Sequence, residues 1–179
     1  MTAAVITSTI RRAQPPDAPG MIAVLDVVAQ EDGMLLDPGG RTVAHEWARL
    51  SQEGPSAPFA TWVVEDPVTH AILGTSEAVQ GDTSKTQRVV TVALALLPSL
   101  RRQGVGRQLM RAMEAWARER GAWKMSLVCL SHNRPAMTFY HNVGYDQEAR
   151  LLGHYVIEQA AVDAVWWVKW LDGPYADRK

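Results

Sequence analysis

The sequence predicts an α/β (α+β) domain with a mixed, mostly antiparallel, twisted sheet of about six to seven strands, a central parallel pair and about four flanking helices. β-rich segments alternate with amphipathic helical segments along the chain. Residues 88–130 have the order strand, helix, strand, and such units almost always have parallel strands. The other strands follow one another through short turns, which favours antiparallel pairing.

The N-terminal third is expected to hold one strand and two helices. The strand covers Thr7–Arg12 and ends at the prolines that follow it. Apolar residues at three- and four-residue spacing predict a helix from near Pro19 to Gly33. After a turn at Asp37–Gly40, a second helix is expected over Thr42–Gln52.

Three β-rich segments come next and predict an antiparallel meander, over Ala60–Glu65, Ile72–Val79 and Arg88–Leu97. The third segment is apolar at nearly every position from Val89 to Leu97. Such a run indicates burial on both faces and a central place in the sheet. We therefore expect this strand to be covered on each side.

The last part of the chain is expected to complete the parallel unit and then form a hairpin. Gly121 is placed to end the helix predicted at Val105–Arg120 in a left-handed conformation. A turn is expected at Glu158–Ala161. The predicted elements are a helix at Val105–Arg120, a strand at Trp123–Leu130, a helix at Arg134–Asn142 and strands at Tyr145–Tyr155 and Val162–Leu171.

The composition fits a single globular domain over residues 1–179. Its formal net charge of -1 provides no positive field for nucleic acid or anionic lipid. The longest near-apolar run, Val89–Leu97, is far shorter than the ~20 residues of a membrane span. Cys129 lies in an apolar run and is expected to be a buried thiol. We expect a soluble cytoplasmic protein without nucleic-acid or membrane partners.

A glycine turn between a buried strand and a helix carries the clearest chemical signal. Unpaired N–H groups of a first helical turn attract anions, and Gly104 and Gly106 allow a phosphate to approach closely. Arg101, Arg102 and Arg107 add positive charge. The segment therefore predicts a phosphate-binding turn.

Two familiar phosphate motifs do not fit this turn. A Walker loop requires Lys and Ser or Thr after its last glycine, whereas Gly106 is followed by Arg107 and Gln108. A dinucleotide fingerprint requires a small residue where this chain has Leu109, and it normally follows the first strand. An enzyme that binds nucleotide phosphates here is thus the weakest hypothesis.

Two segments resemble motifs of the GNAT superfamily of N-acetyltransferases. Arg101–Gly106 matches its R/Q-x-x-G-x-G/A motif, and Asn133–Tyr145 resembles its N-x-x-A-x-x-F-Y-x-x-x-G-F/Y signature. Pro98 stands where that family often has proline, and the resemblance is most specific from Val89 to Tyr145. It implies that the central parallel pair splays apart for coenzyme A.

The resemblance also implies roles for individual residues. Backbone groups of Leu96 and Leu97 would bind the pantetheine amides, residues 103–107 the pyrophosphate, and Asn133 the cofactor arm, while Tyr140 would protonate the departing thiolate. The alternatives are that Asn133 only caps a helix and that Tyr140 is a core aromatic. The implied cofactor-binding residues are Leu96, Leu97, Arg101, Arg102, Gln103, Gly104, Val105, Gly106, Arg107, Asn133 and Tyr140.

The sequence does not single out one general base, because Val89–Ala95 contains no carboxylate where many relatives have a glutamate. The candidates are Glu77 on the neighbouring strand, His154 on the sixth strand, or a water chain. Of the side chains, we expect Glu77 and Tyr140 to be catalytic. The histidines show no metal-ligand spacing, so no metal is expected.

The resulting hypothesis is an acetyltransferase that moves the acetyl group of acetyl-CoA to a primary amine of a small molecule or peptide, by direct attack in a ternary complex. Its alternative is a non-catalytic module of the same fold that binds coenzyme A or acyl-CoA. Trp166, Val168 and Trp170 share one strand face, which is either core, acceptor pocket or dimer contact. A homodimer is therefore one hypothesis for the assembly of this protein.

Overall fold

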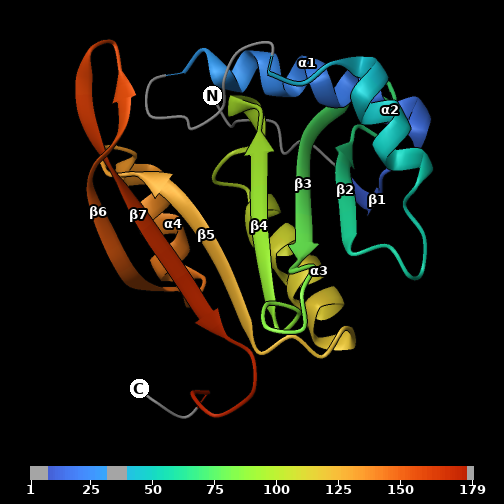
Figure 1. Ribbon diagram of the computed structural model, residues 1–179. Coiled ribbons are helices and arrows are strands. Elements are labelled where there is room, and N and C mark those ends of the chain that lie inside the picture. Colours follow the sequence, from blue (N-terminus) through green and yellow to red (C-terminus); the bar gives the residue numbers. More distant parts are fainter. Residues whose placement is uncertain (1–7, 32–39, 177–179) are drawn as a thin grey trace.

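Seven strands form one mixed sheet in the computed structural model, which describes residues 8–31 and 40–176 (Figure 1). The strand order is β1-β2-β3-β4-β5-β7-β6, and every neighbouring pair is antiparallel except β4 and β5. This topology confirms the predicted fold class. The strands are β1 (Thr9–Arg12), β2 (Phe59–Glu65), β3 (Ile72–Gln80), β4 (Val89–Leu96), β5 (Lys124–Leu130), β6 (Asp146–Ile157) and β7 (Ala160–Trp170).

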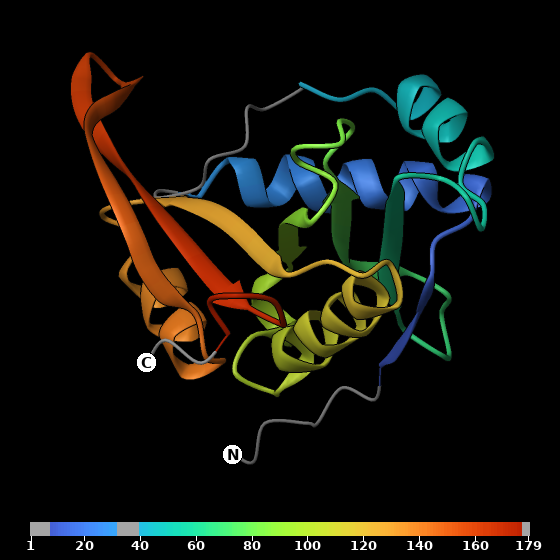
Figure 2. The ribbon, with the colours of Figure 1, turned by 60° about the horizontal axis from the view of Figure 1, so that its bottom comes forward.

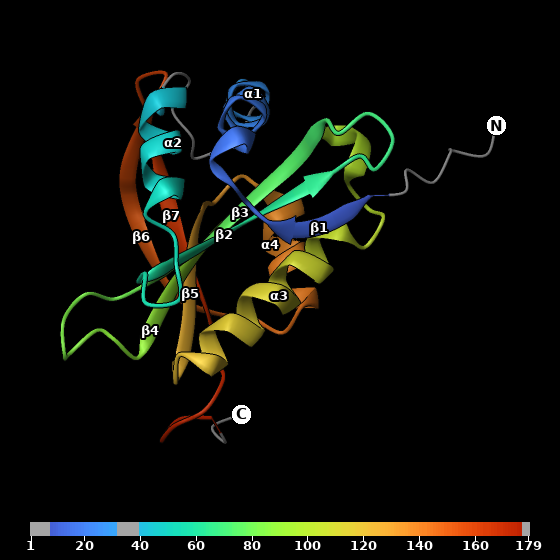
Figure 3. The ribbon, with the colours of Figure 1, turned by 90° about the vertical axis from the view of Figure 1, so that its right-hand side faces the viewer.

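Four α-helices in the described residues cover the sheet. Figure 3, a view along the sheet, shows helices on both of its faces. α1 and α2 lie on one face, and α3 and α4 lie on the other. Short 3-10 turns lie at Pro15–Asp17, between β1 and α1, and at Pro98–Leu100, between β4 and α3. The helices are α1 (Ala18–Ala29), α2 (Val43–Ser51), α3 (Val105–Glu119) and α4 (Arg134–Asn142). None of the described helices is long and apolar enough to cross a membrane.

Local signals in the sequence fix several helix ends. The Thr42 hydroxyl accepts a hydrogen bond from the His45 N–H at 3.2 Å and begins α2. Gly121 has φ 66°, and its N–H bonds the Arg118 carbonyl, so it ends α3 as predicted. The predicted turn at Asp37–Gly40 lies almost entirely outside the described residues.

The β6–β7 hairpin is tighter than the sequence predicted. Ile157 pairs with Ala160, so the turn contains only Glu158 and Gln159 rather than Glu158–Ala161. Both residues have positive φ, 48° and 65°, which is the geometry of a two-residue type I′ turn. Neither residue is glycine or asparagine, which is why composition did not reveal this turn. Figure 2 shows the hairpin projecting beyond the rest of the molecule.

Helix α3 supplies much of the core. Leu109, Met113 and Trp116 are buried on its sheet-facing side and pack with Trp62 of β2. The rings of Trp62 and Trp116 meet edge to face, with centroids 6.5 Å apart. This packing anchors the helix whose first turn follows the phosphate-binding motif.

The prediction that β4 is buried on both faces is wrong for part of the strand, because Thr91 and Ala93 are exposed. β4 pairs with β3 from Val90 to Leu96, but it pairs with β5 only from Val89 to Thr91. Beyond Thr91 the two parallel strands separate, as Figure 1 shows, so the edge of β4 toward β5 is unpaired there. The predicted splay is thus present.

We expect Leu109→Ala to lower the free energy of unfolding by about 2–5 kcal/mol, because Leu109 is fully buried and its truncation leaves a cavity. Urea denaturation measures this loss. Arg111→Ala, at an exposed position of the same helix, should change stability by less than about 0.5 kcal/mol. Equal effects of the two changes would contradict the described packing of α3.

Candidate functional site

A cavity of about 260 Å³ lies where β4 and β5 separate. Its lining comes from both faces of the sheet and from three helical regions. The lining residues are Leu25, Val28, Arg41, Arg49, Thr75, Ser76, Glu77, Thr91, Val92, Ala93, Leu94, Ala95, Val128, Cys129, Leu130, Asn133, Ala136 and Tyr140.

Strand register places the cavity walls on opposite sides of the sheet. Glu77 pairs with Ala93, and both share a face with Ala95, which packs under α1. Cys129 and Tyr140 belong instead to the core cluster on the α3 and α4 side. The cavity therefore passes through the sheet at the splay, so two reactants could meet there from opposite faces.

Backbone groups of β4 line the splay at alternate residues. The Leu97 N–H donates to the Leu73 carbonyl of β3 at 3.0 Å, and the Leu97 carbonyl accepts from the Leu100 N–H at 3.0 Å. Because backbone groups alternate along an antiparallel strand, those of Leu94 and Leu96 point toward β5. Leu96 thus faces the splay, Leu97 is engaged within the chain, and Leu94 is a site residue that the sequence analysis missed.

The glycine turn presents a run of free donors. Arg102 and Gly104 have φ 61° and 83°, and the Gln108 N–H, bonded to the Gly104 carbonyl at 3.1 Å, begins the helical pattern. Within the described chain, the backbone N–H groups of residues 102–107 donate to no acceptor. Consecutive N–H groups around left-handed residues form a concave anion site, and the α3 dipole strengthens it. The geometry agrees with the predicted phosphate-binding turn.

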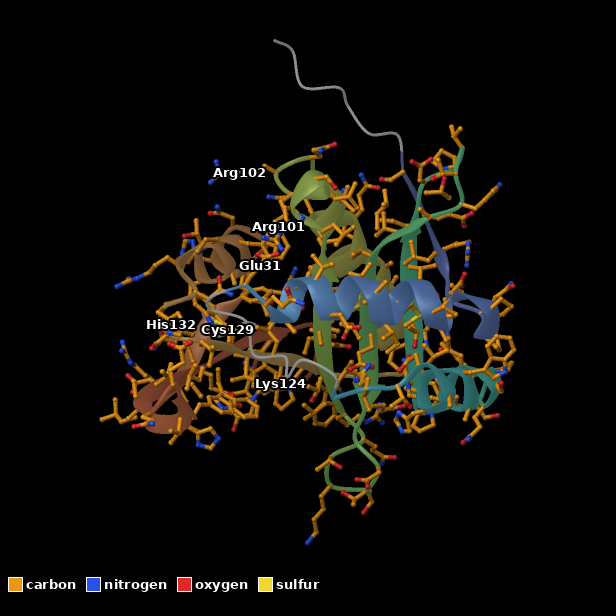
Figure 4. The ribbon with its side chains drawn as sticks, turned by 90° about the horizontal axis from the view of Figure 1, so that it is seen from above. Glu31, Arg101, Arg102, Lys124, Cys129 and His132 are labelled. Atoms are coloured by element: carbon orange, nitrogen blue, oxygen red, sulfur yellow. The ribbon has the colours of Figure 1, made fainter. Side chains whose placement is uncertain are left out.

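The side chains of this turn have different partners. Arg101 forms two hydrogen bonds with the Glu31 carboxylate and two with the Leu96 carbonyl. Gln103 donates to the Ser99 carbonyl, and the Arg107 guanidinium donates to the Asn142 carbonyl at 3.2 Å. Figure 4 shows Arg101 beside Glu31. The charge of Arg101 is therefore balanced inside the protein.

Gly106 allows α3 to approach α4. A Cβ at this position would lie 3.1 Å from the ring of Phe139, closer than nearly all real contacts. Val105, the neighbour of Gly106, is buried in the core and completes this contact region. The close approach places α4, and with it Tyr140, beside the glycine turn.

Tyr140 is almost completely buried and lines the cavity. Its ring packs near Tyr145 and Trp167, with centroids 6.4 and 6.3 Å away. Its hydroxyl has no hydrogen-bond partner among the residues that the structure describes. Burial raises the pKa of Tyr140 well above its usual value, so the phenol keeps its proton at neutral pH. Because Tyr140 lines the cavity, its neutral phenol is a candidate to donate a hydrogen bond or a proton to a leaving group.

Asn133 both caps α4 and lines the cavity, so the two interpretations left open by the sequence are compatible. Its side-chain oxygen accepts the Ala136 N–H at 3.0 Å. Cys129 is buried as predicted, and burial raises the pKa of its thiol. Low exposure and a raised pKa both disfavour a thiolate nucleophile.

A four-charge network lies at the α2 end of the cavity. Glu77 accepts from Arg41 at 2.7 Å and lies 3.6 Å from Arg49. Glu46 is fully buried, accepts from Arg49, and lies 3.6 Å from Arg41. The arginines were not predicted as site residues, because only tertiary packing brings Arg41, before α2, and Arg49, within α2, to Glu77 of β3.

The other candidate base lies elsewhere. His154 belongs to the β6–β7 hairpin, where its ring stacks edge to face on Tyr155 with centroids 4.9 Å apart, and it does not line the cavity. Trp166, Val168 and Trp170 are also not part of the cavity lining. Of the candidates from the sequence, Glu77 alone is in the described cavity wall.

The profile of the Acetyltransferase (GNAT) family matches residues 29–145, which is well over half of the chain. The chain therefore belongs to this family. The matched region includes the splayed pair of strands, the glycine turn and Tyr140. A search of curated protein sequences returned no match.

Solved structures share this fold. An acetyltransferase of the GNAT family from Streptococcus pneumoniae has a TM-score of 0.82 at 20% identity, over 92% of this chain and 99% of that chain. The yncA protein of Salmonella typhimurium, solved with its cofactor acetyl-CoA, has a TM-score of 0.81 at 17% identity. The match covers 94% of this chain and 96% of that chain. A phosphinothricin acetyltransferase from Sinorhizobium meliloti, in complex with AcCoA, has a TM-score of 0.81 at 16% identity. The match covers 96% of this chain and 92% of that chain.

We expect Gly104→Val to weaken coenzyme A binding by about tenfold or more, because a β-branched residue strains at φ 83° and disturbs the free N–H groups. Isothermal titration calorimetry measures the affinity. Gly54→Val is the matched control, since a side chain there meets open space. Unchanged affinity in a folded Gly104→Val protein would show that the turn does not bind the cofactor.

Proposed function

We propose that this protein transfers the acetyl group of acetyl-CoA to a primary amine of a small molecule or peptide. The observation that carries the proposal is the splay of β4 from β5, with free backbone groups on its edge and the glycine turn at its end. Family membership supports it. Two similar structures contain acetyl-CoA.

The donor groups present fit the shape and charge of this cofactor. The N–H groups of residues 102–107 would bind the pyrophosphate, with the exposed Arg102 and Arg107 adding positive charge. The backbone groups of Leu94 and the N–H of Leu96 would bind the pantetheine amides, as strands do when a further strand is added. The Leu96 carbonyl already accepts from Arg101. When bound, acetyl-CoA supplies the thioester carbonyl that an amine attacks.

The remaining side chains assist the transfer of protons. An amine attacks only in its neutral form, and its pKa in water is near ~10, so its proton must be accepted before or during attack. Glu77 lines the cavity on the opposite face of the sheet from Tyr140, and in this proposal it would accept this proton directly or through water. Tyr140 then donates its proton to the thiolate of coenzyme A as the carbon–sulfur bond breaks.

The alternative, a module that binds coenzyme A without turnover, is favoured by one observation. The carboxylate of Glu77 is shared between Arg41 and Arg49, and β4 has no carboxylate of its own. Incubation with acetyl-CoA and a panel of amines, with thiol release as the readout, separates the two hypotheses. The panel includes phosphinothricin, which the relative from Sinorhizobium meliloti is named for, and a polyamine of opposite charge.

We expect Tyr140→Phe to lower kcat by about 10²- to 10⁴-fold, the usual contribution of a positioned acid, while the Kd for coenzyme A stays within about twofold. Thiol release and calorimetry measure the two quantities. Tyr175→Phe, at a partly exposed tyrosine far along the chain, should leave both unchanged. Full activity of the Tyr140→Phe protein would remove this residue from the mechanism.

We expect Glu77→Gln to flatten the rise of rate with pH, because the amide cannot accept a proton. Rates from pH 6 to about 10.5 would be compared with the wild type. Since burial raises the pKa of Tyr140, neither profile should lose rate near the ordinary tyrosine pKa of ~10. An identical profile in the Glu77→Gln protein would assign proton removal to water.

A further inference from the structure

One guanidinium joins three separate parts of the site. The Nε and Nη2 atoms of Arg101 donate to the Leu96 carbonyl at 3.0 and 2.8 Å. Its Nη1 and Nη2 atoms donate to the two oxygens of Glu31 at 2.6 and 2.8 Å. Figure 4 shows the two side chains facing each other above the end of α1. Arg101, at the start of the glycine turn, thus links the end of β4 to Glu31, which lies two residues after the end of α1.

Glu31 is tied to the acceptor side of the cavity. Its N–H donates to the carbonyl of Val28 at 3.1 Å, and Val28 and Leu25 form the α1 wall of the cavity. Val28 also packs against Ala95 of β4. A displacement of Glu31 would therefore move the α1 wall of the cavity.

The bonding of Arg101 indicates positioning rather than phosphate neutralisation. Its charge is already balanced by Glu31, and a bidentate pair fixes both the distance and the plane of the two groups. The two side chains are 37% and 28% exposed. Ion pairs with this exposure contribute little to overall stability, so its main effect must lie elsewhere.

We propose that Glu31 and Arg101 form a positioning pair that holds the phosphate-binding turn in register with the acceptor wall. The inference rests on the proposed function. In this proposal Arg101 and Glu31, which are 70 positions apart in the sequence, share one role in the binding of both reactants. Neither residue touches the reacting atoms.

The test measures cofactor affinity, acceptor KM and kcat in Glu31→Gln, Arg101→Gln and the double variant. Glu31→Gln should raise the Kd for coenzyme A and the KM of the best panel amine by about 3- to 10-fold each, with kcat within about twofold. The double variant should be no worse than Arg101→Gln, because the two residues act as a unit. Glu119→Gln, at an exposed site with no ion pair among the described residues, is the control.

A second readout does not depend on the proposed function. In an NMR experiment on ¹⁵N-labelled protein without ligand, Glu31→Gln should accelerate solvent exchange of the Arg101 Nη–H groups, which donate to Glu31, by at least about threefold. Unchanged exchange, or additive losses of affinity in the double variant, would overturn the pair. Absence of coenzyme A binding by the wild type would refute the proposed function, and the exchange rate would still decide the inference.

Discussion

The separation of β4 from β5 after Thr91 and Ser126 is the constraint on which the site depends. A parallel pair inside a sheet normally satisfies its backbone groups along its whole length. Here β4 keeps its antiparallel bonds to β3 on one edge, and the other edge is not paired with a strand from Leu94 onward. On that edge the Leu96 carbonyl accepts from Arg101. An interior strand with a free edge is a preformed binding surface for an extended, amide-containing ligand.

The rest of the fold stabilises this opening. α1 packs on one face of β4 through Ala95, and α3 packs on the other face through Leu109 and its neighbours, so β4 stays in place without β5. β5 is held instead by β7, which pairs with it from Lys124 to Leu130. Each strand of the splayed pair therefore has its own support, and the cavity between them remains open.

The sequence predicted most of the architecture, because its signals are local. Gly104 and Gly106 at a strand–helix junction, the cap at Gly121 and the helical spacing of α3 each depend on a few neighbouring residues. The apolar run of β4 was misleading, since α1 packs on Ala95 near the end of the strand, while Thr91 and Ala93 on the same face stay exposed. Arg41 and Arg49 were missed for the same reason, as tertiary packing brings them to Glu77.

The central claim is that free backbone N–H groups of the splay and the turn bind the pantetheine and pyrophosphate of coenzyme A. The most direct measurement is a ¹⁵N–¹H NMR titration with coenzyme A, which observes these groups themselves. We expect the largest shifts at Leu94, Leu96 and residues 102–107. Saturable binding with its largest shifts elsewhere, for instance on the β6–β7 hairpin, would contradict it.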